Sequence, residues 1–149
     1  MITNKRGGKP VVQTRRVQRL AREIACGPHS PLILLYGVGS FGHPLAHRHR
    51  LSGRELSIDA LTGAGETISA VRALGGVLAD IFLKEGVPVV PLQTSSFVRQ
   101  HNGELITTHY SLIEDILLHG GVPLFGGDVI IADRRHTAIV SADALASEL

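Results

Sequence analysis

The sequence predicts an α/β fold in which a mostly parallel sheet is sandwiched by helices. Short, continuous apolar runs at residues 32–36, 87–92 and 122–125 are typical of strands buried on both faces. Segments with helical spacing of apolar residues separate these runs, as in strands joined by crossover helices. The chain has 149 residues, 44% of them hydrophobic, which suffices for one core. We therefore expect a single domain over residues 1–149.

The first forty residues contain a loop, a helix and a strand in the predicted order. Residues 1–10 are polar and glycine-rich, without strand or helix periodicity, and predict a loop. A helix follows, because Thr14 is a suitable cap, apolar residues recur at helical spacing after it, and Gly27 and Pro28 end it. The strand at residues 32–36 comes next and runs into a glycine-rich turn.

The segment after this turn predicts a short helix and then a surface region. Pro44 suits the first turn of a helix, where its missing N–H costs nothing. Residues 46–59 are polar and charged, and they predict a mobile surface segment. Because this segment follows the glycine turn, it is a candidate lid.

A long helix is predicted over residues 61–84. Six of its apolar residues recur at helical spacing and can form one stripe: Ile68, Val71, Leu74, Leu78, Ile81 and Phe82. Gly75 and Gly76 interrupt it at a cost of about 1 kcal/mol each against alanine. The pair therefore marks either a kink or a close crossing with another helix or a substrate.

The second half of the chain predicts two hairpins, two helices and two strands. After the strand at residues 87–92, Asn102 and Gly103 predict the turn of a first hairpin. The other predicted elements are a helix over residues 110–119, a strand over 122–125, a hairpin of strands 129–132 and 137–140, and a final helix over 144–149.

Composition excludes several classes of function. The net charge is +2, aromatic residues make up 4% of the chain, and no base-reading motif is present, so we expect no nucleic-acid partner. No apolar run approaches the roughly 20 residues that span a bilayer, so we expect no membrane partner and a cytoplasmic location. The single cysteine, Cys26, cannot form an internal disulfide and is expected to be buried.

The turn after the first strand has the composition of a phosphate-binding loop. Gly37, Gly39 and Gly42 allow close approach of the backbone to an anion, and Ser40 and His43 add a hydroxyl and an imidazole. A helix N-terminus beyond the turn would add partial positive charge. The loop lacks the Gly-Lys-Ser/Thr ending of a P-loop, and its GxGxxG pattern has no obvious acidic ribose partner. A purely structural turn therefore remains the alternative.

A metal site in this region is not predicted. His43, His47 and His49 are close in sequence, and the first two can share a helix face. No cysteine or carboxylate completes a ligand set, and the adjacent Arg48 and Arg50 would repel a cation. We expect the histidine with the glycine loop, His43, to contact phosphate instead.

Ligands of parallel α/β sheets bind at the carboxyl ends of the strands. The first glycine loop, the second glycine turn at Gly126 and Gly127, and Asp143 all follow predicted strands. We expect these three features to meet at one edge of the sheet.

Six blocks of sequence carry a family resemblance, in the order in which that family has them. They are Ile2-Thr-Asn-Lys5, Gly39-Ser-Phe-Gly-His-Pro44, Ser95-Ser-Phe97, Asn102-Gly103, Gly127-Asp-Val129 and Ser141-Ala-Asp143. With these blocks the chain resembles the amino acid kinase superfamily, and within it the isopentenyl phosphate kinases. The glycine-Ser-Phe-Gly-His block is shared with the related fosfomycin-type antibiotic kinases.

The resemblance implies transfer of the γ-phosphoryl group of ATP to isopentenyl phosphate, a small phosphorylated isoprenoid, with Mg²⁺ assisting. Phosphoryl transfer depends on positioning and positive charge. The implied catalytic residues are His43, Lys5 and Asp143. The implied substrate-binding residues are Gly37, Val38, Gly39, Ser40, Gly42, His43, Gly127 and Asp128, with Lys5 and Gly39 also near the cofactor, and no metal ligand. The long helix would line the pocket for the isoprenoid tail.

The chain also departs from the family pattern. The expected His-Gly-Gly-Gly is Tyr36-Gly-Val-Gly39, and the expected Ser-Gly-Asp is Ser141-Ala-Asp143. The family opens with a strand carrying Lys-x-Gly-Gly-Ser and continues with a nucleotide-binding lobe, and neither is present. We therefore expect the chain to be the N-terminal, acceptor-binding lobe, cut at both ends. Whether it is active or inactive alone stays open at this point. A homodimer or a complementary nucleotide-binding chain is the expected partner. The alternatives are a fosfomycin-type or other phosphate or phosphonate kinase, and a non-catalytic anion-binding remnant.

Overall fold

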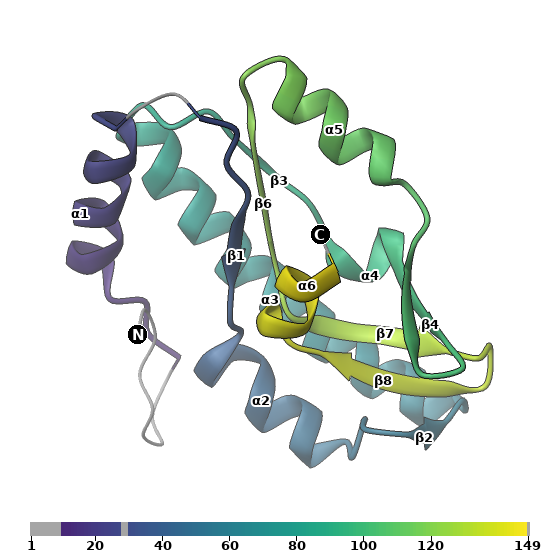
Figure 1. The fold of residues 1–149 in the computed structure, drawn as a ribbon. Coiled ribbons are helices and arrows are strands. Elements are labelled where there is room, and N and C mark those ends of the chain that lie inside the picture. Colours follow the sequence, from purple (N-terminus) through teal and green to yellow (C-terminus); the bar gives the residue numbers. More distant parts are fainter. Residues whose placement is uncertain (1–9, 28–29, 149) are drawn as a thin grey trace.

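The computed structural model describes residues 10–27 and 30–148 of the chain, which form an α/β fold (Figure 1). A three-stranded parallel sheet has the order β1 (Leu34–Tyr36), β6 (Val122–Gly126) and β3 (Val89–Pro91). Leu34 pairs with Leu124, and Val89 pairs with Val122. All five residues of β6 are buried, as expected for a central strand covered on both faces.

Helices cover both faces of this sheet. On one face, α1 (Thr14–Ala25) and α3 (Ile58–Lys84) contact each other, and α3 packs on β3 and β6. On the other face, α5 (Tyr110–Leu118) packs on β6 and α6 (Ala142–Glu148) on β1. Leu124 belongs to the core beneath α1 and α3, and Phe125 to the core beneath α5 and α6. Neighbouring residues of β6 therefore fill the two cores alternately.

A second sheet has the order β2 (Arg54–Glu55), β8 (His136–Val140), β7 (Asp128–Ala132), β4 (Val98–His101) and β5 (Glu104–Thr107). Its strands pair antiparallel, except that β4 and β7 pair in parallel at Gln100 and Ala132. The chain passes directly from β6 of the first sheet into β7 of the second at Gly127. The end of β1 and the start of β7 therefore lie close together.

The predicted fold class is confirmed, and both predicted hairpins form. The first turns at Asn102 (φ 50°) and Gly103 (φ 84°), and it belongs with the second hairpin to the antiparallel sheet. The predicted helices appear as α1, α3, α5 and α6 with ends shifted by a few residues. The loop predicted over residues 1–10 lies almost entirely outside the described residues.

The long helix α3 follows the prediction. Five of the six stripe residues are buried in it, and Ile68 is half-buried. Its N-terminus is capped by Ser57, whose hydroxyl accepts a hydrogen bond from the Ala60 N–H at 3.2 Å. A Cβ atom at Gly75 would collide with the Tyr36 hydroxyl, so Gly75 marks a close crossing with β1.

None of the described helices, α3 included, has the length and hydropathy to cross a membrane.

The prediction of a mobile surface segment over residues 46–59 is wrong. The helix α2 (Gly39–Arg48) continues through Ala46, β2 pairs with β8, and α3 begins at Ile58. Leu51 is completely buried, and the Thr137 hydroxyl donates a hydrogen bond to its carbonyl at 2.6 Å. The polar composition of this segment reflects its exposed face, whereas its few apolar residues anchor it. A lid is therefore not supported.

Three local predictions also need correction. The helix after the glycine turn starts at Gly39, so Pro44 lies in its second turn, because the Val38 carbonyl already accepts hydrogen bonds from the Phe41 and Gly42 N–H groups. Strand β1 begins at Leu34, two residues later than predicted. Cys26 is exposed, because it caps the C-terminus of α1 instead of lying on its buried face.

Candidate functional site

A cavity of about 370 Å³ lies where β1 ends and where α2 and α6 begin. We call it the His43 cavity. The predicted site residues that line it are Gly37, Val38, His43, Gly127 and Asp143. They come from the β1–α2 turn, the β6–β7 connection and the β8–α6 connection. The expected meeting of two glycine turns and Asp143 at one edge is therefore realised in space.

The start of α2 presents hydrogen-bond donors that no other described residue uses. Gly39 has φ 46°, a backbone conformation that favours glycine. The N–H groups of Gly39 and Ser40 precede the first intrahelical bonds, and no described residue accepts from them. The Ser40 hydroxyl is buried and also has no partner among the described residues. These groups suit an anion.

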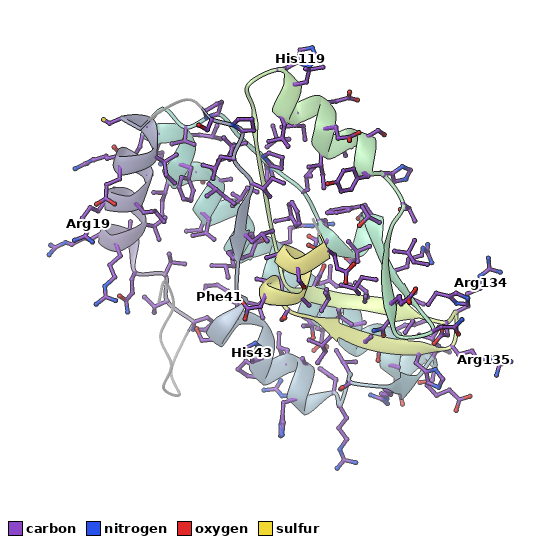
Figure 2. All side chains as sticks on the ribbon, viewed as in Figure 1. Arg19, Phe41, His43, His119, Arg134 and Arg135 are labelled. Carbon is purple, nitrogen blue, oxygen red and sulfur yellow. The ribbon has the colours of Figure 1, made fainter. Side chains whose placement is uncertain are left out.

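His43 and Asp143 supply the two ionisable side chains of the cavity. Figure 2 shows His43 on the early part of α2, below α6, and its side chain is exposed. Asp143 is exposed in the first turn of α6, where a carboxylate interacts favourably with the helix dipole. The Ser141 hydroxyl caps that helix by accepting from the Ala144 N–H at 3.0 Å. No described arginine or lysine lines the cavity.

Val38 occupies a position at which the family that this chain resembles has glycine. Its φ of −73° and ψ of −18° are ordinary right-handed values that a β-branched residue adopts without strain. Its side chain is 8% exposed and lines the cavity. The departure at this position therefore leaves the loop geometry intact.

Four predicted site residues within the described part of the chain do not line the cavity: Gly39, Ser40, Gly42 and Asp128. Gly42 is buried at the crossing of α2 and α3, where an added Cβ would lie 2.7 Å from Val38 Cγ2 and 3.2 Å from Val71 Cγ2. Asp128 is 3% exposed, with both carboxylate oxygens bonded to other parts of the chain. Lys5 lies outside the described residues. The close packing of Gly42 positions the loop.

The β6–β7 connection is held tightly against β1. The Gly127 N–H donates a hydrogen bond to the Tyr36 carbonyl at 3.2 Å. A Cβ at Gly127 would lie 2.8 Å from the Val140 carbonyl oxygen, and a Cβ at Gly126 would lie 2.5 Å from the Tyr36 carbonyl oxygen. The two glycines are therefore needed where three chain segments converge on the cavity.

A second cavity of about 240 Å³, which we call the α3 cavity, lies between the first half of α3 and the second sheet. Its lining is largely apolar and includes Leu61, Ala64 and Ile68 of α3 together with Val129 and Ile131 of β7. Ser95, Arg99 and Thr137 add polar atoms. A largely apolar cavity with a few polar atoms in its lining suits a ligand with a hydrocarbon part.

Burial raises the pKa of Tyr36 to about 12, and the negative charge of Asp128 adds to this shift. The unfolded tyrosine ionises near pH 10.0, whereas the folded one keeps its proton to about pH 12. The stabilisation is complete below pH 10, and we expect it to be lost as pH rises through 12. The loss should reach about 2–3 kcal/mol, at 1.36 kcal/mol per pKa unit.

Urea unfolding of the wild type and of Tyr36→Phe between pH 9 and pH 12 measures this effect. The difference between the two proteins cancels the titration of lysines and of Tyr110. If the free energies of unfolding of the two proteins change with pH in the same way, the raised pKa of Tyr36 is contradicted.

The sequence analysis did not identify two kinds of residue: further residues that line the His43 cavity, and a hydrogen-bond partner of Asp128. Ile139 and Ala146 line the His43 cavity, and only the alternation along the strand before α6 could have indicated Ile139. Gln93 donates a hydrogen bond to Asp128 at 2.6 Å. Its place at the carboxyl end of β3 was a usable signal, since polar residues there tend to be functional.

Comparisons with known proteins agree on one family. The model of the amino acid kinase family matches residues 2–149. A protein named isopentenyl phosphate kinase from Methanothermobacter thermautotrophicus is 34% identical over 151 residues, covering 97% of this chain and 57% of the relative. Another of that name from Methanocaldococcus jannaschii is 32% identical over 114 residues, covering 75% of this chain and 43% of the relative.

Solved structures give the same result. One described as X-ray structures of isopentenyl phosphate kinase has a TM-score of 0.89 at 35% identity, covering 99% of this chain and 63% of the other. A crystal structure described as the T. acidophilum isopentenyl phosphate kinase product complex has a TM-score of 0.84 at 22% identity, covering 99% of this chain and 59% of the other, and it supports the fold alone. The chain spans 57% of the length of the first relative and 63% of that of the first structure.

Proposed function

The chain belongs to the amino acid kinase family, and from that premise we propose that it binds the acceptor in ATP-dependent phosphorylation of isopentenyl phosphate to isopentenyl diphosphate. The observation that carries this proposal is the His43 cavity. It brings together the glycine loop with His43, Gly127 of the β6–β7 connection and Asp143 after β8, which come from three separate connections. We assign residues 1–149 to the acceptor-binding lobe of the fold.

The acceptor phosphate binds at the start of α2. The Gly39 and Ser40 N–H groups and the Ser40 hydroxyl donate hydrogen bonds to its oxygens, and His43 contributes a further donor. Positive charge around the transferring group and correct placement of the acceptor are what this reaction requires of a protein. His43 would hold the acceptor and stabilise the group in transfer.

The hydrocarbon end of the acceptor occupies the α3 cavity. Its leucine, isoleucine and valine lining favours an isoprenoid tail over the small polar body of a fosfomycin-type substrate. This lining is the reason for preferring isopentenyl phosphate among the phosphate and phosphonate acceptors.

ATP supplies the γ-phosphoryl group when bound, and Mg²⁺ neutralises the charge of the phosphates. Within residues 10–27 and 30–148 no group of three or more metal-binding side chains is close enough to hold an ion. Mg²⁺ is often held through substrate phosphates and one or two carboxylates. Asp143 is the carboxylate on the His43 cavity. It would orient the lysines of the reaction, of which Lys5 is our candidate in this chain.

We expect His43→Ala to weaken binding of isopentenyl phosphate by the 149-residue chain by about tenfold or more. A hydrogen bond to a charged group contributes about 1.5–3 kcal/mol, and this substitution removes one. Isothermal titration calorimetry of the wild type and the variant measures the effect. A coupled assay with ATP and Mg²⁺ tests turnover in parallel.

His47→Ala is the matched control, because His47 lies one turn further along α2, is exposed and does not line the cavity. It should bind the acceptor like the wild type. Unchanged binding by His43→Ala would contradict the assignment of the loop. Tighter binding of fosfomycin than of isopentenyl phosphate would identify the alternative acceptor, and binding without turnover would indicate that the chain alone is not catalytic.

A further inference from the structure

Asp128 lies between the two cavities in the chain. Gly127, on one side of it, lines the His43 cavity, and Val129, on the other side, lines the α3 cavity. The Asp128 side chain is 3% exposed and lines neither. The role of this buried carboxylate therefore has to be found in its hydrogen bonds with other segments of the chain.

Three N–H groups donate hydrogen bonds to this carboxylate. Gln93 Nε2 and the Ser95 backbone N–H donate to Oδ2 at 2.6 and 3.0 Å, and the Val129 backbone N–H donates to Oδ1 at 2.9 Å. Ser95 itself lines the α3 cavity. The carboxylate thus ties the start of β7 to the segment between β3 and β4.

The connection extends to the long helix. Arg72 Nε on α3 donates a hydrogen bond to Gln93 Oε1 at 3.4 Å, which orients the Gln93 amide so that its NH₂ group faces Asp128. A parallel bond joins the same segments, because the Thr94 hydroxyl donates to the Gly126 carbonyl at 2.6 Å. The long helix, the segment after β3 and the glycine connection of the His43 cavity are therefore linked through the side chains of Arg72, Gln93 and Asp128.

A carboxylate suits this position because all three of its partners are donors. An ionised Asp has acceptor atoms only, whereas an Asn side chain has one acceptor and an NH₂ group. In either orientation of an Asn at this position, its NH₂ group would face at least one N–H group. Asn has almost the shape of Asp, so this substitution changes the bonding without changing the volume.

We propose that Asp128 is a positioning residue, which fixes the placement of the phosphate-binding end of the acceptor site relative to its tail-binding end. This inference rests on the proposed function. Asp128 acts through Gly127, Ser95 and Val129 and does not touch the acceptor. Asp128 affects the affinity for ligands that occupy both cavities at once, whereas the affinity for a ligand that occupies only the phosphate end does not depend on it.

Two ligands test this role: isopentenyl phosphate, which carries a tail, and methyl phosphate, which does not. Calorimetry gives the ratio of their dissociation constants for each protein. We expect Asp128→Asn to reduce the preference for the tail-bearing ligand by about tenfold, the size of a coupling between neighbouring groups, while binding of methyl phosphate changes little. Gln93→Ala, which leaves two of the three bonds, should give a smaller reduction.

Asp133→Asn is the matched control. It is the same substitution on the same hairpin, but Asp133 bonds to Asn102 and His101 at the far turn, away from both cavities. Its ratio should equal that of the wild type. Hydrogen exchange provides a second measurement, since the Ser95 amide should lose protection in Asp128→Asn and keep it in Asp133→Asn.

The outcomes separate this role from the proposed function. Equal losses for both ligands in Asp128→Asn would indicate general damage to the fold and would overturn the positioning role, and so would an unchanged ratio. If Asp128→Asn does not fold, the ratio for Gln93→Ala decides. A wild-type chain that binds neither phosphate overturns the proposed function, and the positioning role falls with it.

Discussion

The substitution Gly126→Ala is expected to destabilise the protein by more than about 3 kcal/mol, or to prevent folding. A Cβ atom there would lie 2.5 Å from the Tyr36 carbonyl oxygen and 2.5 Å from Tyr36 Cε2. Tyr36 is paired with Gly126 in the parallel sheet, so its backbone cannot move away without breaking the β1–β6 ladder. Forcing the strands apart would also open the His43 cavity.

Thermal and urea unfolding followed by circular dichroism would measure this loss. Gly76→Ala is the control, because Gly76 is exposed in α3 and an added Cβ there meets nothing within 4 Å. It should stabilise the protein by about 0.5–1 kcal/mol, the preference of a helix for alanine over glycine. A Gly126→Ala protein as stable as the wild type would show that the register of β1 and β6 is not as described.

Gly42→Ala is expected to damage the proposed site more than His43→Ala does. The added Cβ would lie 2.7 Å from Val38 Cγ2 and 3.2 Å from Val71 Cγ2, at the crossing of α2 and α3. Overpacking of this kind costs about 1–3 kcal/mol. Because the start of α2 must shift as a unit, the backbone donors and His43 are displaced together. Acceptor binding should therefore weaken by more than tenfold.

A second substitution tests the cause of this loss. Val38→Ala removes the nearest contact of the new Cβ, Val38 Cγ2 at 2.7 Å, but leaves Val38 Cβ at 2.9 Å and Val71 Cγ2 at 3.2 Å. The double variant Val38→Ala with Gly42→Ala should therefore recover part of the stability and acceptor binding. Unfolding curves and calorimetry on the two single variants and the double variant give the coupling. Losses that simply add would contradict the contact between these two positions.

Much of the fold could be predicted from the sequence because its signals are local. The stripe that includes Val71 and Leu74 specifies α3, and Asn102 with Gly103 specifies a hairpin turn. The carboxyl-end rule for parallel sheets correctly anticipated that the turns after β1 and β6, with His43 and Gly127, would come together. Asp143 joins them from the end of β8, an antiparallel strand of the second sheet to which the rule does not apply. Their roles in binding and catalysis are proposals.

What the sequence could not indicate depends on contacts between distant segments. Because residues 46–59 are mostly polar, their sequence gave no sign that Leu51 is buried. Its burial depends on Thr137 and the second sheet. Gly42 and Asp128 look like ligand residues in a glycine-rich context, but their actual neighbours are Val71 on α3 and Gln93 after β3. No local sequence pattern distinguishes a glycine whose missing side chain leaves room for a ligand from one whose missing side chain leaves room for a neighbouring helix.

The order of strands in the parallel sheet has a consequence for synthesis of the protein. Among the described strands, β1 and β3 pair only with β6, which comes last of the three in the sequence. When residues 34–36 and 89–91 leave the ribosome, their central partner at residues 122–126 has not yet been made. The nascent chain therefore has unpaired apolar strands until β6 inserts between them, and this is the stage at which we expect it to depend on chaperones.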